Sequence, residues 1–182
     1  MSVYKPSGVV WQNFDYYRGI TAVTGGANQG TLYLTAMDLP KGFKVTNIYW
    51  RSGSTALTRG TSSHYWLAIF DVSRNLLGQS TDDTASAVGA NALLTKALAT
   101  PYITTYSGLF YVGYMIYADT GFGGIQPTVS IFNAPSATIH DQATAGGGAK
   151  FNGSSSTGLT NTAPNPAAAI TSVAGVPWMG VS

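Results

Sequence analysis

Near the middle of this 182-residue chain lies the run Gly108-Leu109-Phe110-Tyr111-Val112-Gly113-Tyr114-Met115-Ile116-Tyr117-Ala118. Successive side chains of a strand point to opposite faces of its sheet, and this run is apolar at both sets of alternate positions. It therefore predicts a central strand that is buried on both faces. A sheet of this kind needs a second layer to cover it, which favours a β-sandwich.

Outward from this run, short β-rich segments recur between turns that contain Gly, Pro, Asn and Asp. Leu76-Leu77-Gly78-Gln79-Ser80 follows the turn Ser73-Arg74-Asn75 and predicts a hairpin with the strand before it. Together the segments predict an all-β fold, an antiparallel β-sandwich that is jelly-roll-like, with an immunoglobulin-like order as the alternative. The further strands are expected at 31–37, 43–51, 64–72, 93–98, 128–132 and, in the last apolar stretch, within 170–179.

The two ends of the chain differ from this pattern. Residues 1–30 mix aromatic residues with turn formers and are interpreted as an extended N-terminal arm. The sandwich domain is expected to span residues 31–182, with a long Gly-, Ser- and Asn-rich loop at about 143–166 that contains Gly146-Gly147-Gly148.

Charged residues are scarce: nine Lys or Arg and seven Asp make up 9% of the chain, and there is no Glu. Because Glu, Lys and Arg usually populate the exposed faces of helices, this composition argues against a helical protein. A weakly charged surface also suits burial in a larger assembly, because unpaired charges are costly to desolvate. The basic residues do not cluster, so we expect no nucleic-acid partner. No apolar run has the length of a membrane span, so no membrane partner is expected either, and the lack of a signal peptide predicts synthesis in the cytoplasm.

Few residues offer catalytic or metal chemistry. With no cysteine, any such site would depend on His64 or His140. Adjacent residues of an extended segment point to opposite sides, so His140 and Asp141 do not form a base with its orienting carboxylate, and no Gly-x-Ser-x-Gly elbow is present. Asp82-Asp83 is interpreted as a solvated loop rather than a calcium site. We predict no enzyme activity, no metal and no cofactor.

Aromatic side chains are the main candidates for binding. The chain has four Trp and eleven Tyr, and such rings serve either as core or subunit contacts or as stacking surfaces for sugars. Trp50, Tyr102 and Trp178 are predicted as ligand-binding residues because they lie near strand ends or loops. Contacts in an assembly are predicted for the aromatic residues of the arm, which are Tyr4, Trp11, Phe14, Tyr16 and Tyr17.

Several segments together resemble a domain of minor tail and other virion proteins from phages that infect actinobacteria. The resemblance covers about residues 30–118 and contains no catalytic signature. It implies a multimeric β-sandwich that is attached to a capsid or tail and can contact glycans of the host envelope. The segments that carry it are Gly30-Thr31-Leu32-Tyr33-Leu34-Thr35, Leu39-Pro40-Lys41-Gly42 with Val45-Thr46-Asn47-Ile48, Trp66-Leu67-Ala68-Ile69-Phe70-Asp71 with Leu76-Leu77-Gly78-Gln79-Ser80, and Thr100-Pro101-Tyr102 with Gly108-Leu109-Phe110-Tyr111-Val112-Gly113.

The leading hypothesis is therefore a bacteriophage virion structural protein that decorates the capsid or the tail. We expect a homo-oligomer, with a trimer favoured, that binds other virion proteins through many weak contacts. The alternative is a lectin-like receptor-binding domain that recognises host cell-surface glycans.

Overall fold

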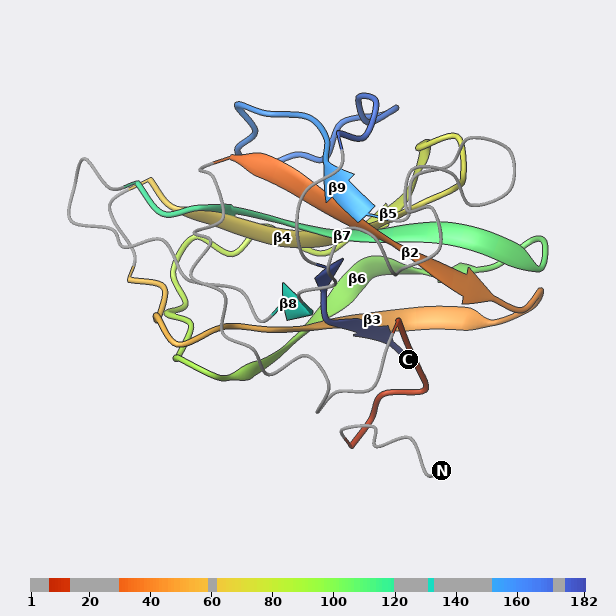
Figure 1. Ribbon diagram of the computed structural model, residues 1–182, viewed down its shortest axis with the longest axis horizontal. Helices are drawn as coiled ribbons and strands as arrows, with labels where there is room; N and C mark the ends of the chain where they lie inside the picture. The colour runs from red at the N-terminus through yellow and green to blue at the C-terminus, as the bar shows by residue number, and fades with distance from the viewer. Residues whose placement is uncertain (1–6, 14–29, 59–61, 120–130, 133–151, 172–175) are drawn as a thin grey trace.

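The computed structural model describes residues 7–13, 30–58, 62–119, 131–132, 152–171 and 176–182. In this part of the chain there are strands and no helix, so the all-β prediction is confirmed. The strands form two antiparallel sheets and a short ribbon (Figure 1). The four-stranded sheet has the order β1 (Trp11–Gln12), β11 (Met179–Val181), β3 (Lys44–Arg51) and β6 (Leu93–Ile103); the five-stranded sheet has the order β5 (Leu76–Gln79), β4 (His64–Phe70), β7 (Gly108–Tyr117), β2 (Thr31–Leu39) and β9 (Asn152–Ser154); β10 (Val176–Pro177) pairs with β8 (Ile131–Phe132).

The strand order is that of a jelly roll. If β8, β9 and β10 are set aside, eight strands remain, and these can be ranked by their order along the chain. Across the four-stranded sheet the ranks are first, eighth, third and sixth. Across the other sheet they are second, seventh, fourth and fifth. Consecutive strands therefore cross between the sheets, except at the β4–β5 hairpin. The antiparallel sandwich predicted from the sequence is confirmed, and the immunoglobulin-like alternative does not apply.

Strand β7 lies at the centre of the five-stranded sheet, as its sequence predicts. It pairs with β2 along its length, from Thr31 opposite Ile116 to Leu39 opposite Gly108, and with β4 on its other side. Phe110, Val112, Tyr114 and Ile116 face the core between the sheets, whereas Tyr111 and Met115 face the other way. Because both faces of the strand are buried, its uninterrupted apolar sequence is explained.

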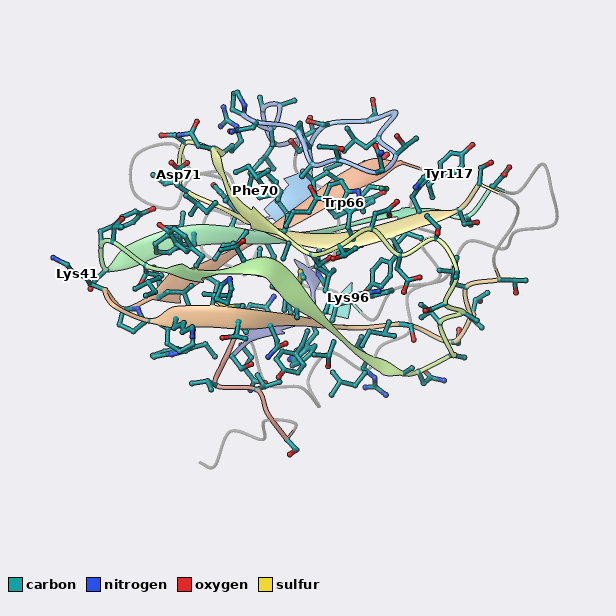
Figure 2. The ribbon with its side chains drawn as sticks, turned by 180° about the vertical axis from the view of Figure 1, so that it is seen from behind. Lys41, Trp66, Phe70, Asp71, Lys96 and Tyr117 are labelled. Atoms are coloured by element: carbon teal, nitrogen blue, oxygen red, sulfur yellow. The ribbon has the colours of Figure 1, made fainter. Side chains whose placement is uncertain are left out.

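The face of the five-stranded sheet that points away from the core is covered by residues 155–171, which we call the C-terminal strap. Leu32, Trp66, Phe70 and Tyr111 form an apolar layer on this face, and the strap packs Leu159, Ala163, Ala167 and Ile170 against it. Figure 2 shows Trp66 and Phe70 on the side of the sheet that faces the strap. The sheet is thus enclosed between the second sheet and the strap.

The strap and β9 modify the prediction of a long loop at about 143–166. Residues 143–151 lie outside the described residues, but Asn152–Ser154 forms β9 and pairs with β2. Further along, the strap is held by main-chain and side-chain hydrogen bonds rather than by regular pairing. Trp66 Nε1 donates to the Thr160 carbonyl (2.7 Å), and the Ala167 N–H donates to the Arg74 carbonyl (3.0 Å).

The predicted arm is partly a strand of the sandwich. Residues 11–12 form β1, which pairs with β11, with Trp11 opposite Val181. The Asn13 side chain then links the ribbon to the five-stranded sheet, because Nδ2 donates to the Pro177 carbonyl of β10 (2.7 Å) and to Thr35 Oγ1 of β2 (3.2 Å). Residues 1–6 and 14–29 lie outside the described part of the chain, and so do Tyr4, Phe14, Tyr16 and Tyr17.

Candidate functional site

Two of the three residues predicted to bind ligand are buried. Trp50 is 0% exposed and Trp178 is 1% exposed. A ring can stack on a sugar only if one of its faces is accessible, so the fold places neither ring where it can serve as a binding platform. The prediction for these two residues is not supported by their position.

Trp50 belongs to an aromatic column in the core between the sheets. Its ring stacks on Tyr114, with centroids 5.3 Å apart and planes at 8°, and Tyr114 stacks in turn on Tyr33, also at 5.3 Å. The indole N–H donates to the Tyr65 hydroxyl. Burial, with a smaller contribution from Tyr33, raises the pKa of Tyr114 well above its usual range, so this phenol stays neutral.

Trp178 lies on the outer face of the four-stranded sheet, where Val9 and Tyr49 cover it. Tyr49 is fixed above this face because its hydroxyl donates to the Gly8 carbonyl (3.2 Å) and contacts the Ser182 hydroxyl (3.0 Å). The segment that precedes β1 therefore closes over Trp178. Strand alternation alone places Trp178 on an outer face and gives no sign of this cover.

Tyr102, the third predicted residue, lines a surface groove of about 480 Å³. We call it the β5–β6 groove, because its walls are β5 and residues 99–102 of β6. Tyr102 is half-buried, and its ring meets Phe110 edge-on with centroids 6.3 Å apart. The structure thus keeps one of the three predicted residues at a site that a ligand can reach.

The groove arises from an irregularity in β6. Tyr102 pairs with Val45 and Ala97 pairs with Asn47, so four residues of β6, 98–101, lie opposite Thr46 alone. Here β6 bends toward the other sheet and forms a single bridge, Leu98 to Ser80. The sequence signals this site only through Pro101, which we would expect at an edge or a bulge.

The outer side of β6 is an uncovered row of uncharged side chains, which we call the β6 face; the charged residues Arg51 and Lys44 of β3 lie directly opposite its two ends, Leu93 and Ile103. It consists of alternate residues that are all exposed, with Leu93 at 36% and Ile103 at 56%. None of them carries a charge, although long edge strands usually carry charged residues that block association. The members are Leu93, Thr95, Ala97, Ala99, Pro101 and Ile103; of these, Ala99 and Pro101 lie in the irregular stretch and also line the β5–β6 groove.

Trp11 is the one predicted assembly contact among the described residues. Its side chain is 41% exposed and meets the Phe43 ring edge-on at 6.3 Å. Val10 beside it is also exposed. The position of Trp11 is compatible with the predicted contact, which stays a prediction.

Polar residues gather where β4 begins. His64 Nδ1 lies 2.6 Å from Asp82 Oδ2, and the other oxygen of Asp82 accepts the Tyr65 N–H (3.1 Å). Asp83 pairs instead with Lys96, whose ammonium lies 5.1 Å from the centre of the Tyr65 ring. The two adjacent carboxylates thus serve separate structural contacts.

The described residues include no group of three or more His, Cys, Asp or Glu side chains that could hold a metal ion. His140 and Asp141 lie outside the described residues. In the same part of the chain, no helix has the length and hydrophobicity needed to span a membrane.

Comparison with protein-family models finds no match, and a search of curated proteins finds no relative.

Proposed function

We propose that this chain is a bacteriophage virion structural protein, without enzyme activity, that attaches to the capsid or tail as a homo-oligomer. A trimer is the favoured state. In this role the protein acts by multivalent binding, in which many weak contacts add through high effective concentration. Other virion proteins are its partners, and the particle is its location.

The observation that carries this proposal is the β6 face. Six alternate residues of an edge strand are exposed and uncharged, and two of them, Leu93 and Ile103, are large and apolar. Charged residues are depleted at the centres of protein interfaces, because an unpaired charge is costly to desolvate. A surface of this kind is suited to burial against another subunit.

The fold is compatible with this role by analogy. Jelly rolls occur in viral capsid proteins and in lectins, and a fold alone does not define a function. The analogy therefore admits two candidates, the virion structural protein and a receptor-binding domain for host glycans.

The glycan-binding alternative now rests on Tyr102. Its ring lines the β5–β6 groove, whereas Trp50 and Trp178 are buried. If this alternative holds, Tyr102→Ala should abolish retention on host polysaccharide at temperatures well below its unfolding transition, which the lost packing against Phe110 will itself lower. Retention that is unchanged by this substitution would exclude the groove as the sugar site.

The test of the main proposal is electron microscopy of intact particles of the phage that encodes the chain, labelled with antibody to this protein. Label over the capsid is expected for a decoration protein, and label at the tail tip would favour attachment to the host. Absence of label on particles that carry a labelled control protein would overturn the virion assignment.

A further inference from the structure

The β5–β6 groove is bounded by main chain on both sides. Of the residues that form its walls, Ala99, Thr100 and Pro101 pair in register with no residue in the described part of the chain, and the same is true of Leu77. The sheets meet at the bridge between Ser80 and Leu98 and diverge from there. The groove is thus a gap between two edge strands.

The size of the groove matches a short strand. From the spacing of strands, the rise per residue and the separation of packed sheets, one strand residue occupies roughly 160 Å³. A groove of about 480 Å³ therefore accommodates about three residues of an extended chain. The small exposed side chain of Ala99 leaves room on the β6 wall for the side chains of such a segment, whereas the space over Gly78 is filled by Leu98, which would lie 3.3 Å from a Cβ there.

The lining favours an uncharged peptide over a sugar. All eight lining residues are uncharged. A sugar site needs fixed polar side chains to bind hydroxyl groups, but the Gln79 amide already bonds to the strap: Nε2 donates to the Asn161 carbonyl (2.9 Å), and Oε1 accepts the Ala163 N–H (2.8 Å). The remaining polar side-chain groups of the lining are the hydroxyls of Thr100 and Tyr102.

One contact shows that the main chain of β5 can donate a hydrogen bond to an amide group outside its sheet. The Leu76 N–H donates to the side-chain carbonyl Oδ1 of Asn165 in the strap, at 3.0 Å. This carbonyl takes the place that a main-chain carbonyl of a neighbouring strand would occupy. Within the described part of the chain, no main-chain group of the strap hydrogen-bonds to the main chain of the next residues of β5, Leu77, Gly78 and Gln79.

We propose that the β5–β6 groove binds an uncharged, extended segment of a partner polypeptide by strand addition. Main-chain hydrogen bonds to β5 and β6 supply affinity, and contacts with Tyr102 and the small residues of the walls select small or apolar side chains. The bound segment joins the two sheets along the side where they diverge. The inference does not depend on where in a particle the protein lies.

The test uses the full chain labelled with ¹⁵N and three probes, followed by amide chemical shifts. The first probe is a library of end-blocked heptapeptides built from Ala, Ser, Thr and Val. The second has the same side chains with alternate peptide nitrogens methylated, which removes donors needed for strand addition. The third is a pair of neutral oligosaccharides, maltohexaose and cellohexaose.

We expect the first library to shift the amide signals of residues 76–79 and 99–102, and the methylated library to leave them unchanged. Thr100→Asp should weaken binding at least about tenfold, because the carboxylate would be desolvated by the bound segment. Thr105→Asp is the matched control, since Thr105 is exposed in the turn between β6 and β7 and lies outside both the groove and the β6 face. Binding to this variant should be unchanged.

Three results would overturn the proposal. Equal shifts with the methylated library would exclude strand addition. Shifts with the oligosaccharides and none with the peptides would make the groove a sugar site. No shift with any probe at about 1 mM, the weak end of specific affinity, would mean that the groove is not a binding site.

Discussion

Asp82 and Asp83 show how two adjacent residues of one type acquire different roles from their contacts. Burial of Asp83 by itself raises its pKa, but the hydrogen bonds from Lys96 and from the N–H groups of Ser86 and Ala85 outweigh burial and hold this pKa well below its usual range. The N–H groups of Ser86 and Ala85 lie 2.8 and 3.0 Å from Oδ1. The charged carboxylate is thus the form that the fold stabilises.

Asp83→Asn should therefore lower the free energy of unfolding at pH 7 by about 1–3 kcal/mol, the range for hydrogen bonds to a charged group. The pKa in the folded state is below the unfolded value of about 3.9, so this stabilisation is present above pH 4 and is lost as the pH falls further. Urea unfolding of both proteins at pH 7 and pH 3 measures it. The exposed Asp38→Asn is the control; an equal deficit at both pH values for Asp83→Asn would contradict the argument.

Residues such as Trp50 and Trp178 mark the limit of sequence prediction at this scale. Period-two alternation assigns a side chain to one face of a strand, and it does so correctly for β7. It does not say what covers the face. Trp178 is buried because Val9, 169 residues earlier, packs on it, and no local pattern reports such a contact.

At the level of elements, β9 fixes the end of the strap through a close approach of two backbones. A Cβ atom at Gly153 would lie 2.2 Å from the carbonyl oxygen of Thr171 and 2.6 Å from Ile170 Cγ2. Gly153→Ala should therefore force the strap away from β9 and lower the free energy of unfolding by about 1–3 kcal/mol. Chemical denaturation measures the change.

The control for Gly153→Ala is Gly89→Ala, where the nearest atom to the new Cβ is Ala92 Cβ at 3.7 Å. This substitution makes an ordinary van der Waals contact and should leave stability within about 0.5 kcal/mol. Equal stability of the two variants would show that the strap end adapts to a side chain at Gly153.

A single charged substitution in the strap should also release it from the sandwich. Ala167 is buried against the apolar layer that contains Trp66 and Tyr111. Ala167→Asp places a carboxylate there, which should destabilise the docked strap by at least about 2 kcal/mol and expose these rings. Binding of the dye ANS and faster proteolysis within residues 155–171 are the expected readouts, and Ala169→Asp, at an exposed position two residues on, should show neither.

The elements differ in how far the sequence predicts them. β7 is predictable because burial on both faces requires an uninterrupted apolar strand, and its position is confirmed. The strap is not, because it is no strand of either sheet: it docks through a few dispersed, mostly small apolar residues and through main-chain and amide hydrogen bonds, such as those that join Gln79 to Asn161 and Ala163. Such bonds impose no hydrophobic period, so the sequence shows only a polar loop.

At the scale of the whole molecule, the two outer faces of the sandwich differ in how much of each is covered. The strap covers the apolar outer layer of the five-stranded sheet, and Val9 with Tyr49 covers Trp178 on the other sheet. The β6 face belongs to that other sheet and stays exposed. The β6 face is therefore the part of the sandwich to test as the interface of the proposed oligomer.

If the β6 face is the interface of the proposed oligomer, charges on it should dissociate the assembly. In the double variant with Leu93→Lys and Ile103→Lys, each subunit brings two ammonium groups into the interface, and their desolvation and mutual repulsion oppose association. We expect light scattering after size-exclusion chromatography to give the mass of the oligomer for the parent chain and the 19.0 kDa monomer for the variant.

Val72→Lys is the control, because Val72 is 45% exposed and lies in the β4–β5 turn of the other sheet. This variant should keep the parent mass. A double variant that also keeps the parent mass would place the interface elsewhere, and the exposed Trp11 would then be the next residue to test.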